Sequence, residues 1–336
     1  MVAQAQNAAL QALLSSSTPS IAYRARVELL DEAPQSAGLL ALQELIRRSP
    51  LVTGLLSGRA ADGAIHNTHA YGKWQGPHWT LACLAETGYP PGDRSLLPLW
   101  EQVWGWLDGE RHFKFPSTQV IPGQEERVRR CASQEGNAVW YMLKLGLADE
   151  RVETLVQRLL QWQWPDGGWN CDKCPQASMS SLIETIIPIR ALALHGRLCG
   201  DDQSLAAVRR AAEVLLERRL FRRRRDGQVI HPAFLILTAP PFIHYSYFFA
   251  LQVLAEAGLL QDERCCEALD LLEARRLPQG GGWPVERRLY RVSSTITTRG
   301  SYVSWGPAGA RRSNEWATLN ALYILKCAGR IWRSES

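Results

Sequence analysis

The chain has 336 residues, of which 46% are hydrophobic and 21% charged, with a mean hydropathy of −0.19. This balance excludes a disordered chain, a collagen-like chain and a multi-span membrane protein. The 38 lysines and arginines exceed the 33 aspartates and glutamates by a net charge of +5, too small an excess to predict binding to nucleic acid.

Two kinds of predicted helix alternate along the chain. The first kind is apolar on most sides, which predicts burial; these segments are residues 18–30, 78–88, 131–147, 180–196, 244–258 and 314–329. The second kind is amphipathic, and it comprises a short N-terminal helix and residues 36–49, 95–107, 149–162, 203–220 and 263–277. In residues 149–162, for example, Val152, Leu155, Val156, Leu159 and Leu160 recur at helical spacing.

Glycine-containing turns mark a long repeat. They stand at Asp62-Gly63, Asp108-Gly109, Asp166-Gly167, Asp226-Gly227 and Gly280–Gly282, at intervals of 46, 58, 60 and 54 residues. A linear array of such hairpins needs polar caps at both ends, and neither terminal segment is polar enough to be one. We therefore predict an all-α (α/α)6 toroid of about six helical hairpins, which is one domain over residues 1–336.

One of these turns carries a known motif. Gln163-Trp164-Pro165-Asp166-Gly167-Gly168-Trp169 resembles the QW repeat of the terpenoid cyclase and protein prenyltransferase superfamily. Gly281-Gly282-Trp283 is similar, with Arg276 where the Gln is expected. The resemblance is to single-toroid bacterial proteins of the squalene-cyclase-like or prenyltransferase-like kind. It implies an enzyme acting on an isoprenoid or other apolar substrate in the central cavity.

Two motifs of that superfamily are missing from the chain. The Asp-x-Asp-Asp acid of the squalene-hopene cyclases does not occur, and no Asp-x-Cys zinc pair of the protein prenyltransferases can be placed. The resemblance therefore predicts the fold more firmly than the reaction.

Polar and aromatic residues gather in the loops that follow the turns, and these loops should share one end of the ring. That end is where a substrate site belongs. The aromatic faces there could stabilise a carbocation. The predicted substrate-binding residues are His78, Trp140, Trp169, His244, Tyr245, Tyr247 and Trp305.

Three residues near the starts of apolar helices are candidate catalytic groups. Cys131 stands at a helix N-terminus, where the macrodipole favours a thiolate, so it is a candidate nucleophile or metal ligand. Glu184 and Glu315 lie in the first turns of their helices, where a carboxyl group facing a cavity could act as acid or base.

A zinc site is a further hypothesis. Cys171 and Cys174 have the two-residue spacing that lets two thiolates bind one tetrahedral zinc. Cys131 with His231 or His244 could complete the site. This leaves two alternatives to the isoprenoid enzyme: a zinc-thiolate toroid enzyme resembling the lanthionine cyclases, and a non-catalytic scaffold that binds a lipid or peptide.

The sequence also suggests a compartment and a class of partner. The N-terminus lacks the basic and apolar regions of a signal peptide, and no run of about 18 apolar residues occurs. We expect a cytoplasmic protein whose eight cysteines are thiols or ligands. We expect an apolar small molecule or a peptide as substrate and no nucleic acid; peripheral contact with a membrane stays open.

Overall fold

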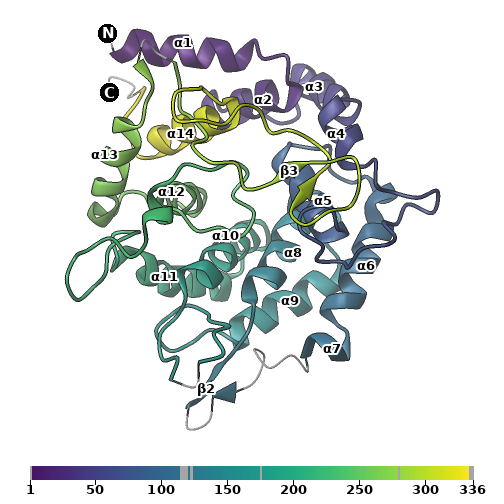
Figure 1. Cartoon of the computed structure of the whole chain (residues 1–336), viewed down its shortest axis with the longest axis vertical. Coiled ribbons are helices and arrows are strands. Elements are labelled where there is room, and N and C mark those ends of the chain that lie inside the picture. The colour runs from purple at the N-terminus through teal and green to yellow at the C-terminus, as the bar shows by residue number, and fades with distance from the viewer. Residues whose placement is uncertain (1, 114–119, 122–123, 175, 279–280, 333–336) are drawn as a thin grey trace.

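We describe the fold from a computed structural model, which covers residues 2–113, 120–121, 124–174, 176–278 and 281–332. Among these residues, six inner helices surround the axis of a ring (Figure 1). They are α2 (Pro19–Arg24) with the π-helical turn η1 (Ala25–Leu29), α5 (Pro77–Glu86), α8 (Ala132–Lys144), α10 (Leu182–Cys199), α12 (Tyr247–Glu256) and α14 (Glu315–Cys327).

A second layer of helices lies outside this ring. It consists of α1 (Val2–Leu14), α3 (Ala37–Arg47) with α4 (Pro50–Leu55), α6 (Leu97–Leu107), α9 (Glu150–Gln161), α11 (Asp202–Leu216) and α13 (Cys266–Ala274). The connections contain α7 (Glu110–Phe113) and the 3-10 turns Arg94–Leu96, Pro232–Leu235 and Glu263–Cys265. They also contain two small sheets: β1 (Val120–Ile121) antiparallel to β2 (Gln124–Val128), and β3 (Arg291–Val292) parallel to β4 (Gly300–Ser301).

The burial of each layer follows from its sequence pattern. All residues of α5 from Pro77 to Ala85 are buried, as expected for a helix that is apolar on most sides. In α9 the buried residues are Val152, Leu155, Val156 and Leu159, and Leu160, the fifth residue of the predicted stripe, is half-buried. The alternation of apolar and amphipathic helices therefore corresponds to inner and outer helices.

The ring is closed by helices from opposite ends of the chain. α5, α8, α10, α12 and α14 pack in that order, and α14 packs on α2 and η1. The Nη1 of Arg24 in α2 lies 3.9 Å from Oε2 of Glu86 in α5, and this ion pair links the first inner helix to the second. The prediction of an (α/α)6 toroid is confirmed.

Two turns of the repeat have the same internal geometry. The indole N–H of Trp169 donates to the carbonyl of Leu159 in α9, and its backbone N–H donates to the Thr185 hydroxyl. Trp283 makes the equivalent bonds to Leu272 in α13 and to Thr318. Each turn thus anchors an outer helix to the inner helix that follows it.

The side chain of Gln163 and the glycines complete the first of these turns. Gln163 Nε2 donates to the carbonyls of Gly167 and of Ala207 in α11, at 2.7 and 2.8 Å. Gly167 has a φ of +99°, and a Cβ there would stand 2.2 Å from the Arg210 carbonyl oxygen. Only glycine fits at that position. The turn thus ties α9 to its neighbour α11; Gly280 of the other turn lies outside the described residues.

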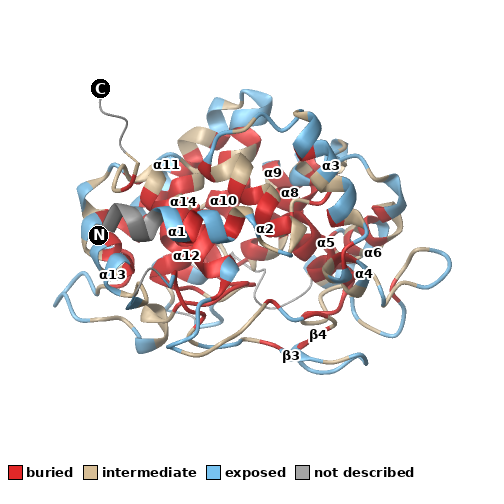
Figure 2. Cartoon of the chain, turned by 90° about the horizontal axis from the view of Figure 1, so that it is seen from above, coloured by how far each residue is buried: buried red, intermediate tan, exposed pale blue. Residues whose placement is uncertain are grey.

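β3 and β4 lie along one edge of the molecule, together with connections from outer to inner helices (Figure 2). We call this edge the loop end of the ring. It carries the site described next.

Candidate functional site

Side chains fill the part of the ring centre that lies between α5, α8, α10 and α12. Among the described residues, the space between α5, α8, α10 and α12 retains a void of about 20 Å³. Phe242 enters from the buried segment 237–242 and stacks on Trp74, with ring centroids 4.0 Å apart. Trp79 meets Trp74 edge-on at 4.6 Å. In this part of the ring the aromatic residues are therefore packed against one another.

Several predicted substrate-binding residues have structural contacts. One face of Trp140 is covered by the Arg190 guanidinium, 3.7 Å from the ring centroid, and Trp169 belongs to the turn described above. The Tyr245 hydroxyl donates to the Leu220 carbonyl at 2.6 Å. Trp305 is buried against Trp316, with centroids 4.9 Å apart.

The hydroxyl of Tyr247 and the indole nitrogen of Trp305 are both buried, with no hydrogen-bond partner among the described residues. Tyr247 is fully buried beside Phe221. His244 is half-buried, its Nδ1 lies 3.3 Å from the Pro241 carbonyl oxygen, and its ring meets Trp74 edge-on.

His78 is a buried, neutral histidine. Its ring nitrogens lie 3.3 Å from the Asn137 amide and 3.3 Å from the Tyr141 hydroxyl, inside a group of aromatic rings. Burial lowers the pKa of His78 to about 3, against the ordinary 6.5. The imidazole therefore stays uncharged in the folded protein at neutral pH.

This histidine should make the protein sensitive to mild acid. Between pH 6.5 and 3 the unfolded chain takes a proton at His78 and the folded chain does not, so stability falls as pH falls. At pH 5 this group alone should cost about 2 kcal/mol of unfolding free energy. Urea unfolding at pH 7 and pH 5 should show a smaller pH effect in His78→Gln than in wild type; equal pH effects would contradict the prediction.

A cluster of three potential metal ligands lies at the loop end. The Sγ atoms of Cys131 and Cys171 and a carboxylate oxygen of Glu184 all lie within 4.8 Å of one another. The Cys171 thiol is 3.4 Å from Oε1 of Glu184. Glu184 is buried, and the two cysteines are half-buried. The structure thus brings together Cys131 and Glu184, which were predicted as catalytic, and Cys131 and Cys171, which were predicted as zinc ligands. We call this group the Cys-Cys-Glu cluster.

Backbone hydrogen bonds between three segments assemble the cluster. Cys131 directly precedes α8, and the neighbouring Arg130 N–H donates to the Asn170 carbonyl at 2.9 Å, which sets Cys131 beside Cys171. The Ser181 N–H donates to the Trp169 carbonyl at 2.9 Å, which brings the start of α10 to the same loop. The cluster therefore depends on the geometry of the turn at Trp169.

The three groups are crowded acids, and the pKa values of Glu184 and Cys171 are shifted. Burial raises the pKa of the Glu184 carboxyl, although it accepts a hydrogen bond from the Ser133 backbone N–H at 3.0 Å. The hydrogen bond to Cys131, together with burial and the nearby Glu184, raises the pKa of Cys171. A divalent cation would relieve this crowding of potential negative charge.

Two residues of the loop before α5 border the cluster and were not predicted from sequence. Burial, followed by the charges of Glu184 and Cys131, raises the pKa of the Tyr71 hydroxyl, so it remains a hydrogen-bond donor. Burial and the repulsion of Arg299 lower the pKa of Lys73. Neither residue belongs to a sequence motif. Only their place in a loop that returns to the loop end of the ring could have identified them.

A buried ion group lies one helical turn beyond Cys131. Oε1 of Glu135 is 2.9 Å from His112 Nε2 and 3.4 Å from Arg130 Nη2. Burial alone would raise the pKa of Glu135, but the His112 hydrogen bond and the charges of His112 and Arg130 lower it. The Arg130 guanidinium also lies 3.8 Å from the Trp162 ring centroid. This group holds the segment of Cys131 against α8.

Four other predicted site residues lie outside the cluster. Cys174 is exposed, and its thiol donates to Gln176 at 3.1 Å. His231 is exposed and accepts the Ala233 N–H at the start of a 3-10 turn. His244 packs on Trp74 as described. Glu315 is exposed in the first turn of α14. The structure does not bring these groups to Cys131.

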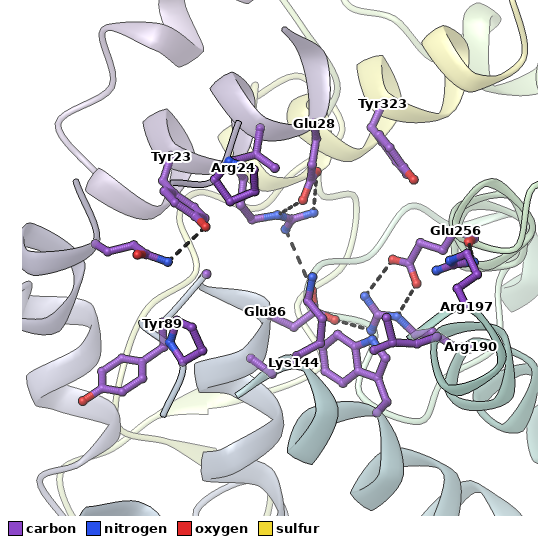
Figure 3. Close-up of a pocket in the computed structure, with 18 of the residues that line it drawn as sticks. Tyr23, Arg24, Glu28, Glu86, Tyr89, Lys144, Arg190, Arg197, Glu256 and Tyr323 are labelled. Atoms are coloured by element: carbon purple, nitrogen blue, oxygen red, sulfur yellow. Dashed lines mark hydrogen bonds and ion pairs between the residues drawn. The ribbon is translucent and has the colours of Figure 1, made fainter. Parts of the chain in front are cut away.

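A pocket lies at the end of the ring opposite the cluster (Figure 3). Its volume is about 450 Å³, and Arg24, Glu28, Glu86, Arg190 and Glu256 lie in its wall. Figure 3 shows Arg190 between Glu86 and Glu256, and Arg24 beside Glu28. These charges pair with one another across four inner helices, so they hold this end of the ring together.

Within the described residues, no helix has both the length and the apolar content needed to cross a bilayer. No protein-family model matches the sequence, and no curated protein matches it either.

Several solved structures are similar to the chain over most of its length. They include an alpha-1,6-mannanase from Salegentibacter sp. (12% identity, 98% of each chain, TM-score 0.44). The Lin0763 protein from Listeria innocua has 12% identity over 98% of this chain and 97% of its own, with a TM-score of 0.45. The type II terpene cyclase MstE from Scytonema has 13% identity over 97% and 96%, with a TM-score of 0.43. At these identities and scores no substrate or reaction is transferred from them to this chain.

Proposed function

We propose that the protein is a zinc-dependent toroid enzyme whose metal is held by Cys131, Cys171 and Glu184. The observation that supports this is the convergence of three ligand atoms within 4.8 Å from three separate segments. Two thiolates and a carboxylate form a donor set that suits zinc, and three protein ligands leave a fourth position open, as in catalytic zinc sites. A zinc ion bound there would activate a water molecule or a thiol as a nucleophile.

The residues around the cluster fit such a reaction. The Tyr71 hydroxyl would donate a hydrogen bond to a negatively charged group beside the cluster, because its proton is retained. Lys73 would supply a positive charge on the same side. The void between α5, α8, α10 and α12, about 20 Å³, is too small for an isoprenoid chain to reach the cluster along the ring axis. We therefore propose that the reaction takes place at the loop end, on a substrate that approaches from outside.

Metal analysis of the purified full-length chain tests this proposal. We expect about one zinc per wild-type chain and a nearly complete loss in Cys131→Ser, Cys171→Ser and Glu184→Gln. Cys174→Ser is the matched control: it removes a thiol of the same Cys-x-x-Cys segment that lies outside the cluster, and it should keep the metal.

Stability supplies a second measurement on the same variants. Zinc at about 100 times its Kd should raise the unfolding free energy of wild type and of Cys174→Ser by about 2.7 kcal/mol. The three ligand variants should show no such increase. A wild-type chain that neither contains zinc nor is stabilised by it would overturn the proposal and favour a non-catalytic scaffold.

A further inference from the structure

The segment that crosses the loop end is strongly basic. Residues 287–312 contain six arginines and no acidic residue: Arg287, Arg288, Arg291, Arg299, Arg311 and Arg312. All six are exposed, and among the described residues none lies within ion-pair distance of a carboxylate. The carboxylate of the preceding Glu286 forms an ion pair with Arg275 and accepts a hydrogen bond from the Leu237 N–H. We call residues 284–313 the basic arm.

Backbone pairing gathers these arginines on one surface. The Arg291 N–H donates to the Arg299 carbonyl, and Gly309 N–H donates to the Val285 carbonyl. Pro284 pairs with Ser313 in an isolated bridge. The two halves of the arm therefore run side by side, and β3 and β4 within it lie along the outer edge of the loop end (Figure 2). Six exposed arginines with no ion-pair partner among the described residues thus lie along this one arm.

Two aliphatic side chains are exposed among these charges. Val292 is 51% exposed and Ile296 is 45% exposed, and both lie between Arg291 and Arg299. The loop that carries Ile296 has a fixed shape, because the buried Gln75 side chain bonds to the Ser293 and Thr295 carbonyls and to the Thr297 N–H. The loop therefore presents Ile296 outward in a defined position.

We propose that the basic arm is a docking surface for an anionic membrane surface. Arginines beside an anionic leaflet are each worth about 1 kcal/mol, and exposed aliphatic residues between them can enter the headgroup region. A nucleic acid fits the arm less well, because single strands bind on exposed aromatic rings. Of the aromatic rings of the arm, Tyr290 and Trp305 are 6% and 1% exposed, and Tyr302 is half-buried. This docking surface does not depend on metal at the Cys-Cys-Glu cluster.

Vesicle co-sedimentation of the full-length chain tests the docking surface. We expect wild type to bind vesicles of phosphatidylcholine mixed with phosphatidylserine, to bind pure phosphatidylcholine far more weakly, and to lose binding as salt is raised. The triple variant Arg287→Gln/Arg291→Gln/Arg299→Gln should bind the mixed vesicles about 100-fold more weakly. Val292→Ser/Ile296→Ser should also bind more weakly, at every salt concentration.

The matched control removes three arginines from another exposed run. Arg223, Arg224 and Arg225 are paired with Asp226 and Glu217, so Arg223→Gln/Arg224→Gln/Arg225→Gln should change vesicle binding by no more than about twofold. Equal losses in the two triple variants would overturn the proposal, because they would reflect net charge alone. So would tight binding of a single-stranded DNA oligonucleotide by wild type with no binding to the mixed vesicles.

Discussion

Arg190→Met should lower the unfolding free energy by about 3–5 kcal/mol. The guanidinium donates to both carboxylate oxygens of Glu256, at 2.6 and 2.8 Å, and also to Glu86. Its side chain is only 7% exposed. Removing it leaves two carboxylates of α5 and α12 without their main partner, at the point where these helices meet α10. Urea unfolding at neutral pH measures the loss.

A surface arginine provides the comparison. Arg222 pairs with Glu267, and both side chains are about one-third exposed, so Arg222→Met should cost about 0–1 kcal/mol. Adding Glu256→Gln to Arg190→Met should restore part of the lost stability, because it removes one of the stranded charges. Equal losses in Arg190→Met and Arg222→Met would show that the buried charges do not hold the ring together.

Trp169→Ala should also cost about 3–5 kcal/mol, the usual range for truncating a buried aromatic side chain. Trp169 is fully buried, and its indole N–H donates to the Leu159 carbonyl at 2.9 Å. The variant opens a cavity between α9 and α10 and removes the partner of that carbonyl. Trp283→Ala should cost a similar amount, since Trp283 makes the equivalent bonds to Leu272 and Thr318.

Trp169→Phe separates the two contributions to this loss. Phenylalanine fills most of the volume and cannot donate to Leu159, so the expected cost is about 1–3 kcal/mol. Thermal or urea unfolding of the three variants gives the comparison. A cost for Trp169→Ala no greater than that for Trp169→Phe would mean that packing at this turn contributes little.

The helical layers could be predicted from sequence because their residues repeat with the period of the helix. Val152, Leu155, Val156 and Leu159 define one buried stripe whatever the rest of the chain does. The ring could be predicted from the repeated turns together with the lack of a polar cap at either end of the array. The packing of Phe242 on Trp74 between the inner helices could not be predicted. Phe242 belongs to a connection without periodicity, and no local pattern shows where such a segment runs.

The candidate site could be predicted only in part, for the same reason. Cys131 and Glu184 were identified by their positions at helix starts, which periodicity fixes. Cys171 was paired in sequence with Cys174, but in space it lies beside Cys131, because the Arg130 N–H bonds to the Asn170 carbonyl. Tyr71 and Lys73 belong to a loop whose return to the ring end depends on long-range packing.

The closure of the ring has a consequence for how the chain folds. Arg24 Nη2 donates to Oδ1 of Asn320 at 3.0 Å, a contact between residues 296 positions apart. Contacts of such sequence separation form slowly, since a long loop must be ordered first. During synthesis the part of α2 that packs on α14 therefore stays uncovered until α14 has been made. The core around α2 is therefore complete only when α14 has packed on it.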